Sequence, residues 1–242
     1  MGISLSEASG GFGGTALESM IIMEEFGKGL VVEPFLETII LCSALIDSCG
    51  TDEQKSEILD QVIAGNMHLA LGFTEPQSRF NLADVTTEAK LKDGNYIVNG
   101  FKSVVMNGPN ANKMIISTRT TGKQTDKDGI TLLVIDVNQD GVSLRNYPTV
   151  DGRRASELTL ENVTVPSSYL LGSEDQGFQL LEDAIDNAII QAESMQVDLD
   201  KILKNMKRWI RLYLKRHKIG EDDIHGLFSV FDENGDGVIS KQ

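Results

Sequence analysis

Apolar residues near the N-terminus recur every three or four positions in three stretches, LESMIIMEEF, FLETIILCSALIDSC and EILDQVIAG. This spacing is typical of amphipathic helices. Thr15, just before the first stretch, fits a capping box with Glu18, and Thr51 with Gln54 repeats this pattern before the third stretch. The second stretch follows Pro34, a residue favoured at helix starts. Glycines end each stretch. The pattern predicts three short helices within residues 15–65, in a helical N-terminal segment over residues 1–66.

After residue 66, apolar and polar residues alternate with a period of two, as expected for half-buried strands. The alternating segments are HLALGF, KLKDGNYIVNGFKSVV, KMIISTRT, GITLLVIDV and ASELTLENVTV. The dipeptides Asp93-Gly94 and Asn99-Gly100 both favour turns. We therefore predict a compact, antiparallel, barrel-like β domain over residues 67–170.

The helical period returns near residue 174, and neither Gly nor Pro occurs from residue 178 to residue 219. Apolar residues there alternate steps of four and three, which places them on one helix face. They are Leu181, Ile185, Ala188, Ala192, Met195, Leu199, Ile202, Met206, Trp209 and Tyr213. The pattern predicts one long helix over residues 174–219, with an apolar face open to self-association. The expected fold class is α+β, ending in a partial EF-hand over residues 221–242.

That partial EF-hand is predicted from the final residues, DENGDGVISKQ. The spacing matches the first eleven positions of a twelve-residue calcium loop, with oxygen ligands at positions 1, 3, 5, 7 and 9. These ligands would be Asp232, Asn234, Asp236, Val238 and Ser240. The bidentate Glu of position 12 is not in the sequence, so we expect only weak calcium binding. A solvated acidic tail is the alternative.

Composition narrows the functional classes. The 242-residue chain has a formal net charge of -14 and a pI near 4.6, which argues against a nucleic-acid partner. Its two cysteines, Cys42 and Cys49, lie in a helical pattern and read as reduced thiols, which indicates an intracellular protein. No secretory leader pattern and no apolar run of membrane-spanning length occurs, so we predict no transmembrane segment.

One long stretch carries a family resemblance: LGFTEPQSRFNLADVTTEAKLKDGNYIVNGFKSVVMNG contains T-E-P, a spaced T-x-A, a DG hairpin and N-G-x-K in order. Together with SEASGGFGG, ITLLVIDVNQDGVSL, ENVTVPSSYLLG and QGFQLLEDAIDNA, it resembles the acyl-CoA dehydrogenase family over residues 2–194. TEPQSRF is most similar to the branch of the pimeloyl-CoA dehydrogenase small subunits, whose partner is a related subunit. The resemblance implies an FAD-dependent oxidoreductase that desaturates an acyl-CoA thioester between Cα and Cβ.

The resemblance also implies where FAD would bind. Phe73 and Thr74 would lie along the flavin, with Thr74 donating through its hydroxyl or its backbone N–H. Arg79 stands in the Gly-Ser stretch that follows T-E-P-x-x in the family, and would offer charge to the cofactor phosphate. Val104 and Met106 replace the Trp and Thr of many members, so ring stacking and a hydroxyl contact are lost while backbone contacts stay available. The alternative is that all these are ordinary barrel residues.

The resemblance assigns no catalytic residue to this chain. The family's base is a Glu late in the C-terminal helical domain, beyond the end of the similarity near residue 194, and Glu75 has a structural place in T-E-P. The leading interpretation is a truncated or fused dehydrogenase chain that is inactive alone. The alternative is a non-catalytic interaction or calcium-sensing module with a vestigial flavin domain.

Overall fold

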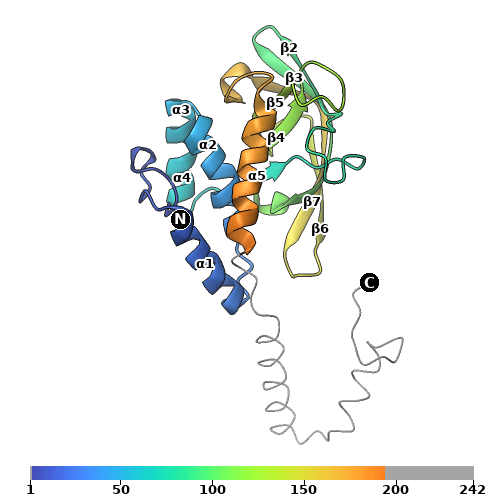
Figure 1. Ribbon diagram of the computed structural model, residues 1–242. Coiled ribbons are helices and arrows are strands. Elements are labelled where there is room, and N and C mark those ends of the chain that lie inside the picture. The colour runs from blue at the N-terminus through green and yellow to red at the C-terminus, as the bar shows by residue number, and fades with distance from the viewer. Residues whose placement is uncertain (1, 194–242) are drawn as a thin grey trace, which may run out of the picture. The chain divides into compact units, whose positions relative to one another are not determined.

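The computed structural model describes residues 2–193, which belong to one compact unit. Figure 1 shows the helices gathered beside a twisted β-sheet, with α5 between α1–α4 and the strands. The helical elements are η1 (Glu7–Ser9), α1 (Ala16–Gly29), η2 (Leu36–Ser43), α2 (Ala44–Cys49), α3 (Asp52–Gln54), η3 (Lys55–Leu59), α4 (Asp60–Ile63), η4 (Gly108–Asn110), η5 (Ser167–Tyr169) and α5 (Gly177–Glu193). Segments η2 and η3 are π-helical and each runs directly into the α-helix that follows.

The three predicted N-terminal helices are present. Thr15 and Glu18 form the expected capping box at the start of α1, and Thr51 with Gln54 forms another at α3. The end of α1 differs in detail from the glycine rule, because Leu30 takes the left-handed conformation there, with φ 52°.

The strands are β1 (Leu69–Gly72), β2 (Glu88–Lys92), β3 (Asn95–Met106), β4 (Lys113–Arg119), β5 (Ile130–Asp136), β6 (Val142–Pro148), β7 (Arg154–Pro166) and β8 (Leu170–Leu171). Their order is β6-β7-β3-β2-β4-β5-β8, and β1 pairs with β4. The prediction of a barrel-like, wholly antiparallel domain was wrong. The sheet stays open because β6 and the two-residue β8 form its two ends and do not pair with each other. It is not wholly antiparallel, because β4 pairs in parallel with both β1 and β2.

Of the two predicted turns, only one is a turn. Asp93 and Gly94, both with positive φ, join β2 to β3. Asn99 and Gly100 instead lie inside β3, where the pairing with β7 shifts register in a β-bulge. A Cβ on Gly100 would come within 2.6 Å of the Thr87 Cα, so the glycine here allows a close approach of two backbone segments.

The core has two main clusters. One joins the helices to one face of the sheet and includes Ile39, Ile46, Leu71 and Leu181, while the second lies among the strands. Helix α5 begins at Gly177, within the range predicted for the C-terminal helix, and buries Leu181 in the first cluster. The rest of that helix and the calcium loop lie outside the described residues.

Candidate flavin-binding site

The T-E-P segment leaves β1 and is fixed at once to β3. The Ser103 backbone N–H donates to the Thr74 carbonyl at 2.9 Å, and the Thr74 hydroxyl donates back to the Ser103 carbonyl. The side-chain donor that the sequence offers to a cofactor is therefore already used. The Thr74 backbone N–H donates to no acceptor within the described residues, so it is the donor that remains.

Next to Ser103, the chain is strained. Val104 has φ 52°, in the left-handed region that β-branched residues avoid, and the β3–β7 pairing shifts register between Lys102 and Val105. This bulge turns the Val104 side chain outward, where it is 54% exposed. Backbone strain of this kind costs about 1–3 kcal/mol and clusters at ligand sites. An exposed apolar side chain next to the residue that is hydrogen-bonded to Thr74 suits contact with the face of a planar ring.

The other predicted residues lie close in sequence to these two segments. Phe73 is partly buried against the helical core, and Met106, at the end of β3, lines a cavity of about 220 Å³. Arg79 lies in the turn after T-E-P with φ 49°, is exposed, and makes no ion pair within residues 2–193. The structure thus brings Thr74 next to Ser103, the residue before Val104 in the bulge. In the described part of the chain, no hydrogen bond joins Arg79 to the other residues predicted to contact FAD.

Beneath this surface, Glu75 and Lys102 form a fully buried ion pair, with Oε1 2.7 Å from Nζ. The backbone N–H groups of Thr86 and Thr87 also donate to the Glu75 carboxylate, at 2.9 and 3.1 Å, and Lys102 donates to the Ser117 hydroxyl at 3.1 Å. Burial alone would raise the pKa of Glu75, but the Lys102 charge and side-chain hydrogen bonds from Lys102, Thr86 and Gln77 lower it to about 2. Glu75 therefore holds the T-E-P segment and is too weak a base to take a substrate proton.

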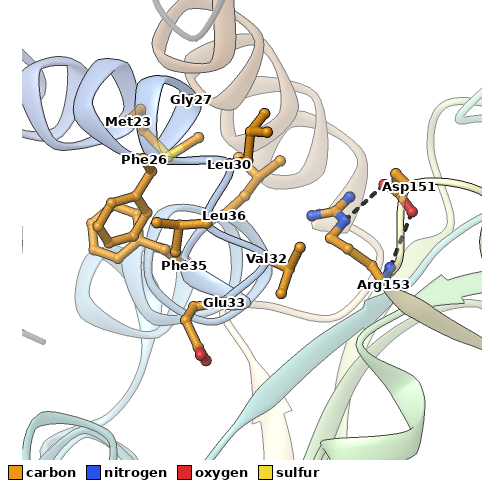
Figure 2. Close-up of a pocket in the computed structure, with 11 residues that line it drawn as sticks. Met23, Phe26, Gly27, Leu30, Val32, Glu33, Phe35, Leu36, Asp151 and Arg153 are labelled. Carbon is orange, nitrogen blue, oxygen red and sulfur yellow. Dashed lines mark hydrogen bonds and ion pairs between the residues drawn. The ribbon is translucent and has the colours of Figure 1, made fainter. Parts of the chain in front are cut away.

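A second ion pair was not predicted from the sequence. Arg153, in the turn between β6 and β7, donates from Nη1 to Glu37 Oε1 of η2 at 2.8 Å. Figure 2 shows the Arg153 guanidinium reaching from this turn toward the helical segment, with Asp151 on its other side. The partners are 116 positions apart, and the only local signal is the Gly-Arg-Arg run after a turn.

Two cavities meet at Arg153, and Glu37 lines the smaller of them. The cavity that Met106 lines also has Glu37, Asn107 and Arg153 in its wall. The second, of about 310 Å³, is mostly apolar and shares Val32, Glu33 and Arg153 with the first. Its other apolar lining residues are Val31 and, as Figure 2 shows, Met23, Phe26, Leu30, Phe35 and Leu36. The fold thus places an apolar space and a polar space side by side, next to the predicted flavin contacts.

Comparison with known protein families identifies the family to which the chain belongs. Residues 1–66 match the N-terminal domain of acyl-CoA dehydrogenases, and residues 70–163 match their middle domain. The chain belongs to the acyl-CoA dehydrogenase family. The mixed α+β fold with an open sheet is the fold of this family's solved structures.

Individual family members show how far the similarity extends. The short-chain specific acyl-CoA dehydrogenase of Clostridium acetobutylicum is 30% identical over 226 residues, which are 90% of this chain and 58% of that protein. The structure of butyryl-CoA dehydrogenase from Megasphaera elsdenii matches with a TM-score of 0.74 at 27% identity, covering 80% of this chain and 53% of that one. The ChsE4-ChsE5 complex from Mycobacterium tuberculosis matches with a TM-score of 0.71 at 28% identity, covering 77% and 48%. This acyl-CoA dehydrogenase chain spans about half the length of the curated relatives it matches.

Neither a metal site nor a membrane segment is found in the described residues. Residues 2–193 contain no group of three or more His, Cys, Asp or Glu that could hold a metal ion. The calcium ligands predicted from the sequence lie outside this part of the chain. Among the described helices, none combines the length and the apolar character that crossing a bilayer requires.

Proposed function

We propose that this chain is an FAD-dependent oxidoreductase of the acyl-CoA dehydrogenase type, which desaturates an acyl-CoA thioester between Cα and Cβ. The observation that carries the proposal is the hydrogen-bonded junction of Thr74 with Ser103, beside the outward bulge at Val104. FAD, when bound, would supply the acceptor for the β hydride. Family membership supports the same cofactor.

Different residues would contact different parts of FAD. The Thr74 backbone N–H would donate to the flavin ring, where negative charge grows on reduction, since the hydroxyl is bound to Ser103. Phe73 and Val104 would provide apolar contact, and Met106 would border the ring on the side of the 220 Å³ cavity. Arg79, exposed and unpaired within residues 2–193, would meet the phosphate groups.

The base that removes the α proton is proposed to lie outside residues 2–193. Glu75 is excluded by its pairing with Lys102 and its low pKa, and Glu37 is held by Arg153. A missing positioned base typically costs about two to four orders of magnitude in rate. We therefore expect this chain alone to bind the flavin and to turn acyl-CoA over slowly.

Purification in the presence of FAD tests this function. The expected result is a yellow protein with about one flavin per chain and little turnover of butyryl-CoA or octanoyl-CoA with a dye acceptor. Failure to bind FAD would contradict the proposed function. Turnover at the rate of a complete dehydrogenase would show instead that the base lies within this chain.

The partner is proposed to be a second dehydrogenase subunit, either related or identical. The likeness to one chain of the ChsE4-ChsE5 complex and the TEPQSRF stretch of the pimeloyl-CoA dehydrogenase branch both favour a related subunit. Free thiols at Cys42 and Cys49 support an intracellular location. Sedimentation of the purified chain at micromolar concentration tests self-association, for which a monomer is the contrary result.

Calcium sensing by the C-terminal residues is the second candidate, and the spacing of Asp232, Asn234 and Asp236 favours it. Without the position-12 Glu, we expect a Kd near or above roughly millimolar. Calorimetry with CaCl₂ on the 242-residue chain, and on the same chain extended by Glu and a short helix, tests this. Micromolar binding without the extension would contradict the account, and a colourless chain that binds calcium would favour a non-catalytic role.

A further inference from the structure

The Glu37–Arg153 pair has unused hydrogen-bonding capacity in a cavity wall. Glu37 is only 4% exposed, and its Oε2 atom is buried without a hydrogen-bond partner, while Oε1 accepts from Arg153. Arg153 uses Nη1 for Glu37 and Nε for Asp151, at 2.8 and 3.1 Å, and Nη2 donates to no residue in the part of the chain that the structure describes. The pair therefore keeps one acceptor atom, Glu37 Oε2, and one donor atom, Arg153 Nη2, without a partner among the described residues.

An unsatisfied buried carboxylate oxygen is costly, so it calls for a partner that carries a proton. Asn107, in the same cavity wall, does not donate to Glu37 Oε2, and its amide nitrogen instead donates to the Leu69 carbonyl at 3.3 Å. The cavity that Glu37 lines is about 220 Å³, large enough for several atoms of a ligand. The missing partner can therefore be a group on a ligand that enters this cavity.

The charges around the Glu37–Arg153 pair exclude a carboxylate as the ligand group that contacts Glu37 Oε2. Arg153 already contacts Glu37 and Asp151, and Glu33 lies in the same wall. A further carboxylate beside Glu37 would place like charges together where solvent screening is weak. Arg154, which also lines the cavity, is exposed, and its charge is screened by solvent.

The surroundings indicate what carries the polar group. Val32, Pro34 and Met106 stand beside Glu37 in the smaller cavity, and the adjoining 310 Å³ cavity is lined mainly by apolar side chains. A hydrocarbon chain suits both spaces. A hydroxyl on such a chain would donate to Glu37 Oε2 and accept from Arg153 Nη2, thereby matching both free positions.

We propose that Glu37 and Arg153 select an acyl group that bears a hydroxyl on its hydrocarbon chain, in preference to a plain alkyl or a dicarboxylic acyl group. The inference rests on the proposed function, since it assumes that the ligand is an acyl-CoA. Hydrogen bonds to charged groups are among the stronger ones in proteins. The hydroxyl should therefore improve affinity by about tenfold or more over an unsubstituted chain.

Calorimetry on the FAD-loaded full chain tests the proposal with matched ligands. Hexanoyl-CoA is compared with 6-hydroxyhexanoyl-CoA and adipoyl-CoA, and octanoyl-CoA with 8-hydroxyoctanoyl-CoA and suberoyl-CoA. At one of these lengths, the hydroxylated thioester should bind about tenfold tighter than both of its analogues. Equal binding of all three ligands at both lengths, or a preference for the dicarboxylic ester, would overturn the proposal and leave the proposed function standing.

Two variants test whether the preference for hydroxylated thioesters depends on the Glu37–Arg153 pair. Glu37→Leu removes the free acceptor and should bring the ratio of affinities for hydroxylated and plain thioesters close to one. Glu161→Leu makes the same change at an exposed carboxyl group of β7 that lines neither cavity, and should leave that ratio unchanged. Free CoA is titrated as well. If Glu37→Leu weakens the binding of free CoA as much as it weakens the binding of the hydroxylated thioester, the pair contacts the CoA moiety and the inference is overturned. If no thioester binds although FAD does, both the acyl-CoA function and this inference fail. The comparison of ligands on the unaltered chain holds even if Glu37→Leu does not fold.

Discussion

The two buried carboxylates Glu75 and Glu37 are used differently, although each is paired with a cation. Glu75 lies beneath the T-E-P segment, has a fully buried Lys102 for a partner and accepts further hydrogen bonds from Thr86 and Thr87. Glu37 pairs with a partly exposed Arg153 and keeps an oxygen without a partner. A fully satisfied polar network stabilises one conformation, whereas a partly satisfied one leaves capacity for a ligand.

The difference predicts opposite responses to ligands and to mutation. Changes at the Glu75–Lys102 pair should act mainly on folding, because both side chains are fully buried and paired with each other, out of reach of a ligand. Changes at Glu37 should act mainly on binding, because the partly exposed Arg153 can turn to solvent when its partner is lost.

Lys102→Met should have the largest effect on stability. Removing one partner of a buried ion pair leaves an uncompensated charge, which typically costs about 3–5 kcal/mol. Denaturant unfolding measures the loss. The double variant with Glu75→Gln should lose less than the sum of the two single variants, and simple additivity would contradict a coupled pair.

Acid should weaken the same pair. The folded-state pKa of Glu75 is lowered from the usual 4.5 to about 2, so the folded protein holds its carboxylate charge at pH values where the unfolded chain gains a proton. The stability that Glu75 contributes is full above its unfolded pKa and is lost as the pH falls through this window, by about 3 kcal/mol in total. Unfolding free energies measured from pH 5 to pH 2 check this slope. With Glu75→Gln, the slope should become smaller, and an unchanged slope would assign the acid sensitivity to other groups.

Arg153→Met should cost less than Lys102→Met. It leaves the Glu37 carboxylate without its cation, and lost hydrogen bonds to charged groups cost about 1.5–3 kcal/mol, reduced here by the partial exposure of Arg153. Thermal and denaturant unfolding compare the two variants directly. A loss as large as that of Lys102→Met would show that both pairs are equally structural, and would remove the distinction between them.

The smallest expected effect is a gain. Val104→Asn replaces a β-branched residue by one that tolerates the left-handed conformation, so the unfolding free energy should rise by about 1 kcal/mol. Denaturant unfolding without FAD measures it. A decrease in stability would mean that Val104 contributes packing that its 54% exposure does not suggest.

Local signals in the sequence predicted the local structure. The capping boxes at Thr15 and Thr51 and the Asp93-Gly94 turn depend on residues within a few positions of each other, and all three are present. The turn predicted at Asn99-Gly100 was wrong, because this glycine lies within a strand and allows a close contact with Thr87. Strand β6 was not singled out by the alternation pattern.

The candidate site was predictable only in part. The T-E-P and N-G-x-K stretches identified the two segments that Thr74 and Ser103 join, through resemblance to a family with that function. The geometry of the bulge at Val104 depends on register with β7, which no short motif encodes. Glu37 and Arg153 meet across 116 positions, and each alone looks like an ordinary surface charge in the sequence.

FAD affinity at two matched surface positions tests the central claim most directly. Val104 and Leu91 are 54% and 56% exposed, and Leu91 pairs with Tyr96, eight residues before Val104 on β3, about 26 Å away along the strand. Titration of FAD into Val104→Asp, Leu91→Asp and the unaltered chain, followed by flavin fluorescence, compares the same charge at both places. We predict that Val104→Asp weakens FAD binding by at least about tenfold, roughly 1.4 kcal/mol, while Leu91→Asp leaves it unchanged. Equal affinities in all three proteins, or a loss at Leu91 alone, would contradict the assignment of the flavin to the Thr74–Val104 surface.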